Sequence, residues 1–308
     1  MVAAGAALWG TDALFRRQLA IDLPSSFVVF AEHLILVVLT IPFLLRARRW
    51  LGEFTRKDWI ALVMVGVGAS ATATFLFTAS FRYGDPTTTL LLQKLQPVFV
   101  VIGARLLLGE RFLPRYVVYF ALAVAGAYFI TFDDPASVTV SQLAPALLSV
   151  GAAALWGMGT VLGRHLSGKV PFAELTSLRF AVGLPATALL VFIDLRGEGW
   201  PAITGEEVGG LLLLSLVPGL IALMFYYRGL TSTPASAATI AELSFPLTAL
   251  VVNYLAFDEL LSASQWVGLL LLAGTVTVMG LSARRGSEGM GIITEERPEP
   301  VSVGAAGG

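Results

Sequence analysis

Apolar runs close to membrane-spanning length recur along the whole sequence of 308 residues. The hydrocarbon core of a bilayer requires about 20 mainly apolar residues for each helix that crosses it. Hydrophobic residues make up 56% of the chain and charged residues 13%, whereas soluble domains carry about 25% charged residues. The chain has too little charge to cover a water-facing surface, so we expect an all-α integral membrane protein. Transmembrane β-barrels show shorter, alternating segments instead.

Composition also excludes several classes of function. The net charge of -1 gives no electrostatic basis for binding nucleic acid. No cysteine is present, which excludes disulfides, thiol catalysis and thiolate metal sites. With only two histidines, His33 and His165, we expect neither a metal site nor a cofactor. The first residues lack the basic start of a cleavable signal peptide, so we interpret them as a retained helix.

The apolar runs and the polar residues between them predict ten transmembrane helices with short connections. These connections leave no room for a second, soluble domain. Residues 284–308 are polar and rich in glycine, and we expect them to form a disordered cytoplasmic tail. The predicted spans lie near 2–20, 25–45, 58–81, 86–107, 113–132, 140–164, 171–193, 206–228, 235–256 and 263–282.

The distribution of lysine and arginine predicts the orientation, because cytoplasmic loops carry an excess of both. With the N-terminus inside, the outer loops hold four of these residues: Arg16, Arg17, Arg82 and Arg196. The inner loops and the tail then hold thirteen: Arg46, Arg48, Arg49, Arg56, Lys57, Arg111, Arg115, Arg164, Lys169, Arg228, Arg284, Arg285 and Arg297. We therefore predict a multi-pass protein of the inner membrane with both termini in the cytoplasm.

The sequence repeats itself. The pentapeptide AALWG occurs at 6–10 and again at 153–157, an offset of 147 positions, and Pro24 and Pro171 open two predicted spans at the same offset. The segment PVFVVIGARLLLGE is echoed 149 positions later by PLTALVVNYLAFDE. We infer two copies of a five-helix unit, which occupy residues 1–134 and 138–283.

An odd number of helices in each copy means that the second copy enters the membrane from the opposite side. Inverted repeats give a fold two nearly equivalent packings, one open to each face of the membrane. Substrate sites in such folds lie near the midplane, between the repeats. We therefore expect transport by alternating access, with a channel or a scaffold as the alternative.

The sequence resembles the EamA-domain family of the drug/metabolite transporter superfamily over about residues 1–283. The resemblance rests on the tryptophan-glycine pair early in each half, on QPVFVVIGARLLLGERF, on the weaker FPLTALVVNYLAFDELL and on the helix count. It implies secondary transport of small metabolites, often export of amino acids or related compounds. It also implies a central cavity lined by helices one to four of each half, with the fifth and tenth helices supporting from outside.

The sequence departs from the family pattern in two places. The second copy reads FDE where the first reads LGE, and the glutamates of these segments, Glu110 and Glu259, lie at helix ends. We expect both glutamates to cap a helix or to dock a loop. The first span also begins late, because Met1 aligns with Leu148 inside the sixth span, and this predicts a natural start upstream of Met1.

Ionisable groups inside a bilayer are costly unless they are paired or hydrated, which makes them candidate functional residues. At a rise of about 1.5 Å per residue, Glu32 and Lys94 lie roughly 10–12 Å below the outer boundary. Arg179 and Glu242 lie at mirrored depths from the inner boundary. We predict two ion pairs, Glu32–Lys94 and Arg179–Glu242, which either fasten helices together or line a wet cavity and bind a zwitterion or act as gates. Buried ion pairs are poor stabilisers, which favours the second interpretation.

Three further polar residues are candidates for substrate binding or gating. Asp12 supplies a spare carboxylate for a substrate ammonium or a coupling proton; alternatively, it reaches water or bonds to Thr11. Gln93 directly precedes Lys94 in the fourth predicted span. His33 has a side chain suited to relaying protons near physiological pH.

Two tryptophans and two prolines complete the candidate set. Trp9 and Trp156 lie near the middle of the membrane, away from the interfacial belts where tryptophan is enriched. They either pack between helices or line the cavity. Pro97 and Pro246 free backbone carbonyls within predicted spans, which produces either a static kink or a helix that bends between states.

A membrane-embedded enzyme acting on lipid-linked substrates is the alternative class, and a non-transporting membrane subunit is a further one. The sequence contains no GxSxG, no HExxH and no phosphate-binding loop, which argues against an enzyme. We therefore predict a secondary transporter that exports amino acids or similar amphipathic or zwitterionic compounds. Its partners are a small-molecule substrate and the lipid bilayer, with protons as a candidate coupling ion and a homodimer as a candidate assembly.

Overall fold

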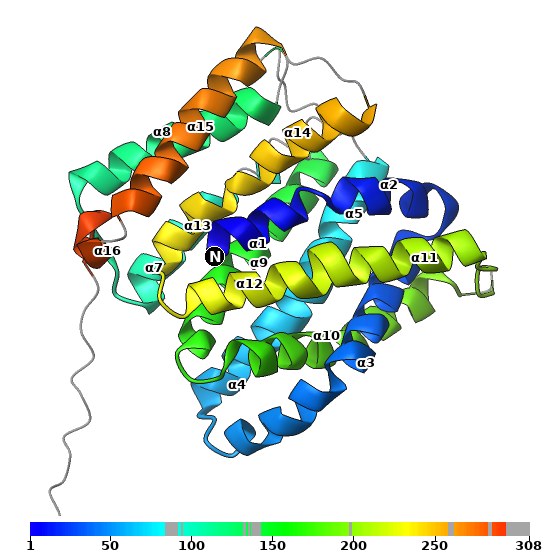
Figure 1. Cartoon of the computed structure of the whole chain (residues 1–308). Coiled ribbons are helices and arrows are strands. Elements are labelled where there is room, and N and C mark those ends of the chain that lie inside the picture. Colours follow the sequence, from blue (N-terminus) through cyan, green and yellow to red (C-terminus); the bar gives the residue numbers. More distant parts are fainter. Residues whose placement is uncertain are drawn as a thin grey trace, which may run out of the picture.

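The computed structural model describes residues 1–83, 92–93, 95–131, 134, 136, 143–196, 199–257, 262–282 and 285–293. Helices dominate this part of the chain (Figure 1). The first half contains α1 (Val2–Trp9), α2 (Asp12–Asp22), α3 (Ser25–Leu51), α4 (Arg56–Val63), the π-helix η1 (Met64–Thr72), α5 (Ala73–Tyr83), α7 (Gln96–Leu107), the short strand β1 (Arg111–Phe112) and α8 (Pro114–Thr131). The second half contains α9 (Leu143–Ser167), α10 (Phe172–Asp194), α11 (Gly205–Leu214), the π-helix η2 (Ser215–Ile221), α12 (Ala222–Leu230), α13 (Ala235–Glu242), α14 (Ser244–Phe257), α15 (Ala263–Ser282), α16 (Gly286–Gly289) and the strand β2 (Ile292–Ile293).

Each of the ten predicted intervals contains helix. Five helical segments are long and apolar enough to cross a membrane, which confirms the predicted helical membrane class. These segments are Ser25–Leu51, Arg56–Phe77, Ala146–Ser167, Phe172–Asp194 and Gly205–Leu230.

Two of the membrane-length segments begin with the same capping device. The hydroxyl of Thr55 accepts a hydrogen bond from the backbone N–H of Asp58, and the Asp58 carboxylate accepts one from the N–H of Thr55. Thr204 and Glu207 form the same reciprocal pair at the start of α11. Such capping boxes satisfy backbone donors that have no partner inside the helix.

Each of these two segments also widens into a π-helix part of the way along. The π-helix η1 follows α4 directly, and η2 follows α11. Pro218 in η2 has no N–H to donate, which interrupts the regular α-helical hydrogen-bond ladder. In η1, a side chain at Gly66 would place its Cβ 2.9 Å from Cβ of Val182, so glycine allows α10 to approach closely.

Two helix pairs frame the fold. The antiparallel helices α3 and α10 are linked at both ends. At one end Ser26 Oγ donates to Asp194 Oδ2 at 2.6 Å, and at the other Arg49 Nη2 lies 3.6 Å from Glu174 Oε1. The helices α8 and α15 lie side by side at one edge of the fold (Figure 1). The edge pair corresponds to the fifth and tenth predicted spans.

The start of the predicted disordered tail is ordered, so that prediction is wrong for residues 285–293. In this segment β2 pairs antiparallel with β1, and Ile292 is fully buried in a cluster that includes Tyr116. The prediction weighed the polar and glycine-rich composition of the whole tail and overlooked its two adjacent isoleucines, which a β-ladder can bury. Residues 294–308 lie outside the described part of the chain.

Candidate functional site

A cavity of about 1010 Å³ lies among the helices of both halves. Its walls are formed by α1, α2, α3, η1, α5, α7, α9, α10, η2, α12, α13 and α14, together with Gln93. No described residue of α8 or α15 lines it. The lining therefore follows the arrangement that the family resemblance implies, in which the fifth and tenth helices stand outside.

The cavity opens toward the end of the molecule where α2 meets α3 and where α10 ends. Asp22, Ser25 and Asp194 line this end, and both aspartates are exposed. The lining residues Tyr226 and Thr239 are buried, with exposed fractions of 3% and 0%. The cavity thus runs from an exposed mouth to a closed, buried end.

Ten of the eleven predicted site residues line this single cavity, although they come from segments far apart in the sequence. Lys94 lies outside the described residues. The lining residues are Trp9, Asp12, Glu32, His33, Gln93, Pro97, Trp156, Arg179, Glu242 and Pro246.

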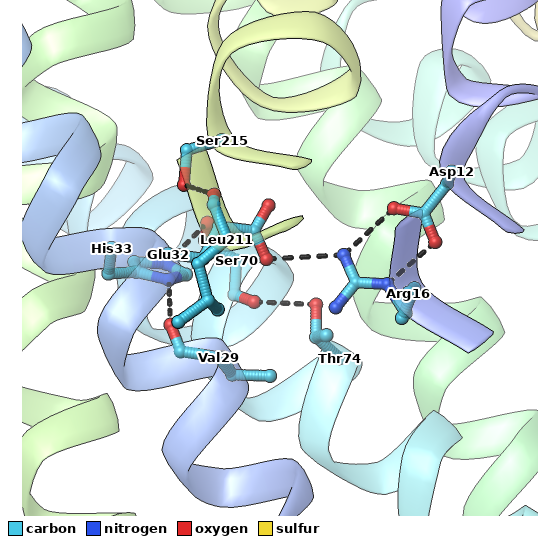
Figure 2. A network of polar contacts seen from close by, with 9 residues as sticks. All are labelled: Asp12, Arg16, Val29, Glu32, His33, Ser70, Thr74, Leu211 and Ser215. Atoms are coloured by element: carbon cyan, nitrogen blue, oxygen red, sulfur yellow. Dashed lines mark hydrogen bonds and ion pairs between the residues drawn. The ribbon is translucent and has the colours of Figure 1, made fainter. Parts of the chain in front are cut away.

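One guanidinium group joins two carboxylates on the cavity wall (Figure 2). Arg16 Nε and Nη2 donate to the two oxygens of Asp12 at 2.6 and 2.9 Å, and Nη2 also donates to Glu32 Oε2 at 3.2 Å. The i,i+4 spacing places Asp12 and Arg16 on the same face of α2. Among the described residues, the cluster has two carboxylates and one cation.

This cluster bears on two predictions. The lysine and arginine distribution places Arg16 in an outer loop, although the predicted span 2–20 contains it, and in the structure Arg16 lies inside α2. Glu32 pairs with Arg16, and its predicted pairing with Lys94 stays a prediction because Lys94 lies outside the described residues. Depth along a helix fixes the height of a side chain in the membrane but not the side of the helix that it faces.

A second polar chain fixes His33 and Arg179 (Figure 2 shows its histidine end). His33 Nδ1 lies 2.9 Å from the carbonyl of Val29 and Nε2 lies 3.0 Å from Ser70 Oγ. A neutral imidazole donates from Nδ1 to the carbonyl, so the Ser70 hydroxyl donates to Nε2. Arg179 donates to Ser70 Oγ at 3.3 Å and to the Tyr227 hydroxyl at 3.0 Å.

Neutral donors surround Glu242 near the buried end of the cavity. Its Oε1 accepts hydrogen bonds from Tyr226 at 2.7 Å and from Thr160 at 3.0 Å, and its Oε2 accepts one from Gln96 at 2.9 Å. Among the described residues it forms no ion pair, so the predicted Arg179–Glu242 pair is wrong. The two residues lie in one cavity, but each has partners of its own.

Two aromatic pairs line the cavity, and each pair joins a residue of the first half to a residue of the second half. Trp9 of α1 lies against Tyr226 of α12, and Trp156 of α9 lies against Phe77 of α5, with ring centroids 5.1 Å apart in both pairs. Both tryptophans are half-buried and border the cavity while packing on their partners. The two interpretations offered for them are therefore compatible.

Sequence reasoning missed further polar and aromatic lining residues, among them five that carry a hydroxyl group. Their signal was present, because each interrupts or borders a predicted apolar span, but hydroxyl and phenol groups carry no charge cost that would single them out. These residues are Ser70, Thr74, Thr160, Tyr226 and Thr239.

Outside the cavity, Glu110 confirms its predicted role as a helix cap. It is 2% exposed, and its carboxylate accepts hydrogen bonds from the N–H groups of Ala235 at 2.8 Å and Ser236 at 3.2 Å, and from the Ser236 hydroxyl. A carboxylate at this position satisfies the first free donors of α13. The start of α13 is thereby tied to the end of the α7 segment.

Asp58 forms a further polar cluster that sequence reasoning did not identify. This fully buried carboxylate lies 2.7 Å from Lys169 Nζ and 2.7 Å from His165 Nε2, while it also caps the start of α4. It does not line the cavity. Its two partners tie the start of α4 to the end of α9 and to the turn that follows.

A helical membrane fold around a polar and aromatic cavity is the architecture of a solute transporter. The model of the EamA-like transporter family matches residues 1–132 and 143–281, and the chain belongs to this family. Family membership and the names of its relatives identify a transporter and not an enzyme.

Three relatives carry the name riboflavin transporter. Riboflavin transporter ImpX of Fusobacterium nucleatum is 30% identical over 88% of this chain and 93% of its own length. The riboflavin transporter of Rhizobium johnstonii is 27% identical over 85% of this chain and 83% of its own length, and that of Brucella anthropi is 25% identical over 82% and 86%. A solved structure titled "Crystal structure of protein", 20% identical, matches 92% of this chain and 96% of its own with a TM-score of 0.73, which shows the fold alone.

Proposed function

We propose that this chain is a secondary transporter of riboflavin or a closely related flat heterocycle, which crosses the cytoplasmic membrane through the central cavity. The observation that carries the proposal is the cavity itself. Its volume of about 1010 Å³ lies at the upper end of the range for drug-sized ligands, roughly 300–1,000 Å³. A free amino acid would fill only a small part of it.

The chemistry of the walls and the names of relatives support this substrate. Two aromatic pairs supply flat apolar surfaces, and the hydroxyl and amide groups beside them supply neutral hydrogen-bonding partners. Three relatives of nearly full-length coverage are named riboflavin transporters.

The proposed mechanism is alternating access by two inverted five-helix repeats, residues 1–134 and 138–283. The family model matches the chain twice, once in each proposed repeat. The capping boxes at Thr55 and Thr204 are 149 positions apart, and each precedes a π-helix in the corresponding helix. Inverted repeats of this kind bind substrate at their interface.

The proposed orientation places both termini in the cytoplasm, as the lysine and arginine distribution predicts. Residues 22–25 then lie at the outer face of the inner membrane, and the described conformation is open to the outside. Protons are the proposed coupling ion, and a homodimer is a compatible assembly.

Export of amino acids or similar zwitterions is the second candidate function. One observation favours it: carboxylates and guanidinium groups of opposite charge, Asp12, Glu32 and Arg179, line the same cavity. Such groups suit a substrate that carries both an ammonium and a carboxylate.

Counterflow in proteoliposomes tests the proposal. Purified protein is reconstituted in vesicles loaded with unlabelled riboflavin, and entry of tritiated riboflavin is followed with and without an excess of neutral amino acids outside. We expect saturable accumulation that excess riboflavin abolishes and amino acids leave unchanged. Accumulation of labelled amino acids alone would support the second candidate, and entry of neither would reject both substrate assignments.

A further inference from the structure

Two hydrogen-bonding atoms in the cavity wall have no partner in the described part of the chain. They are Oε1 of Gln93 and the hydroxyl of Thr239, which belong to lining residues. Thr239 is fully buried, with an exposed fraction of 0%. Because buried polar groups are nearly always hydrogen-bonded, these two atoms require a partner from a ligand or from water.

The two unpartnered atoms flank a fixed contact between two segments. Gln96 donates to Glu242 at 2.9 Å, and Gln93 and Thr239 each precede one of these residues by three positions. Within α13 this spacing puts Thr239 and Glu242 on the same helix face. A polar strip therefore runs along this wall, with hydrogen-bonding capacity unused on both sides of the contact.

The carboxylate of Glu242, which belongs to this strip, positions its neighbours and is not left free for a substrate cation. Among the described residues, all three partners of Glu242 are neutral donors, supplied by Tyr226, Thr160 and Gln96 from three other segments. With both oxygens already engaged, the carboxylate holds the amide of Gln96 and the ring of Tyr226 in place. In the described part of this strip, the free hydrogen-bonding capacity belongs to the neutral groups of Gln93 and Thr239.

A flat apolar surface adjoins the polar strip. The Tyr226 hydroxyl bonds to Glu242, while its ring lies 5.1 Å from the ring of Trp9. A heteroaromatic ring stacked on this pair gains dispersion and quadrupole interactions. Its edge would then face Thr239 and Gln93.

The other aromatic pair is the apolar counterpart. Phe77 and Trp156 stand at positions related to Tyr226 and Trp9 by the offsets of the repeat, 149 and 147. Phenylalanine replaces tyrosine there, so this side lacks the hydroxyl. The cavity therefore offers aromatic surfaces of unequal polarity.

We propose that Thr239 and Gln93 recognise the imide edge of a flat heterocycle that stacks on Trp9 and Tyr226. The inference rests on the proposed function, because the ring system of riboflavin has an imide, an N–H between two carbonyl groups, at one end and a dimethylbenzene edge at the other. The imide N–H donates to Gln93 Oε1, and an adjacent carbonyl accepts from the Thr239 hydroxyl. The dimethylbenzene edge faces Phe77 and Trp156.

Equilibrium binding with two probes tests this assignment. Quenching of flavin fluorescence measures the affinity of the purified protein for riboflavin and for 3-methylriboflavin, in which a methyl group blocks the imide N–H. We expect the wild-type protein to bind the methylated probe at least 5-fold more weakly than riboflavin, which is the effect of about one hydrogen bond. We expect Gln93→Leu, which removes the acceptor, to abolish this preference.

Thr239 is tested with two substitutions, one that removes its hydroxyl group and one that keeps it. Thr239→Val removes the hydroxyl and is expected to weaken riboflavin binding about 5-fold. Thr239→Ser retains the hydroxyl and is expected to keep the affinity of the wild-type protein. The matched control is Thr40→Val, because Thr40 is equally buried in α3 but its hydroxyl bonds to the carbonyl of Leu36.

The outcomes separate this inference from the proposed function. If riboflavin binds and is transported but Gln93→Leu keeps the preference and Thr239→Val behaves like Thr40→Val, the edge assignment is overturned and the transport function stands. Equal loss of affinity in Thr239→Val and Thr239→Ser would also overturn it, because the hydroxyl would then not be the group that is recognised. A wild-type protein that neither binds nor moves riboflavin would overturn both.

Discussion

At the scale of single residues, the most informative group is Arg16. Its guanidinium group bonds to Asp12 and Glu32 on the cavity wall, with 28% of its side chain exposed. Removing one partner of a partly buried charge pair leaves the others uncompensated, which is more costly than the pair itself is stabilising. The cluster is thus both a fixed element of the cavity and a site that a change of charge would disturb.

Replacement of Arg16 by alanine is expected to lower the initial rate of transport about tenfold or more, because two carboxylates then lose the one cation that the described residues supply to them. The rate is measured in proteoliposomes and normalised to the amount of reconstituted protein. Arg48→Ala, at an exposed position near the end of α3, is the control. A rate equal to that of Arg48→Ala would show that the cluster has no part in transport.

Proton coupling through the same cluster makes a separate prediction. If Glu32 or Asp12 carries the proton, Glu32→Gln or Asp12→Asn removes accumulation driven by a pH gradient but spares exchange of substrate at equal pH. Both rates are measured in the same vesicles. Full pH-driven transport in both variants would reject the coupling hypothesis.

The sequence predicted the candidate residues better than it predicted their partners. The cost of burying charge in a bilayer selected Asp12, Glu32, Arg179 and Glu242, and all four line the cavity. Their partners depend on how helices are rotated about their axes, which the position along a span does not determine. Tyr226 contacts both Glu242 and Trp9, yet a neutral phenol gave no comparable signal.

At the scale of helices and strands, the start of α13 depends on a residue from another segment. Glu110→Ala leaves the N–H groups of Ala235 and Ser236 without their acceptor and is expected to lower the free energy of unfolding by about 1–3 kcal/mol. Thermal unfolding in detergent measures the loss. Glu206→Ala, an exposed glutamate in the first turn of α11, should leave the melting temperature nearly unchanged. Equal melting temperatures for the two variants would contradict the capping role.

Close approach of α1 to α12 depends on Gly5. A Cβ at this position would lie 2.6 Å from the carbonyl oxygen of Ala222 and 2.8 Å from the backbone nitrogen of Tyr226, so the two backbones would have to separate. We expect Gly5→Ala to destabilise the protein by about 1–3 kcal/mol, as overpacking does. Gly274→Ala in α15 is the control, since nothing lies within 4 Å of its added Cβ. Equal unfolding temperatures for both variants would contradict this packing.

Helix positions were predictable because apolar runs of spanning length have few alternatives, but helix ends were not. The second predicted span stopped at residue 45, whereas α3 continues to Leu51 through a run of arginines that favour helix as well as water. The first span divides into α1 and α2 at Gly10 and Thr11. Hydropathy records where apolar residues stop, and hydrogen bonding decides where a helix stops.

At the scale of the whole molecule, the exposed lining residues that the structure describes, Asp22 and Asp194, lie at one end of the cavity. The mouth lies at residues 22–25 and at the end of α10, while the opposite end is closed around Thr239 and Tyr226. Alternating access requires a second conformation in which this buried end opens to the other side. The proposed mechanism therefore requires that a residue at the buried end is exposed to each face of the membrane in turn.

The absence of cysteine from the sequence makes this consequence directly measurable. Thr239→Cys introduces a single thiol at the buried end of the cavity, and a membrane-impermeant maleimide is applied to right-side-out and to inside-out vesicles. Cysteine at Thr40, which is buried outside the cavity, controls for non-specific access. We expect labelling of Thr239→Cys from both faces, with protection by substrate. Labelling from one face only, in vesicles that transport substrate, would contradict it.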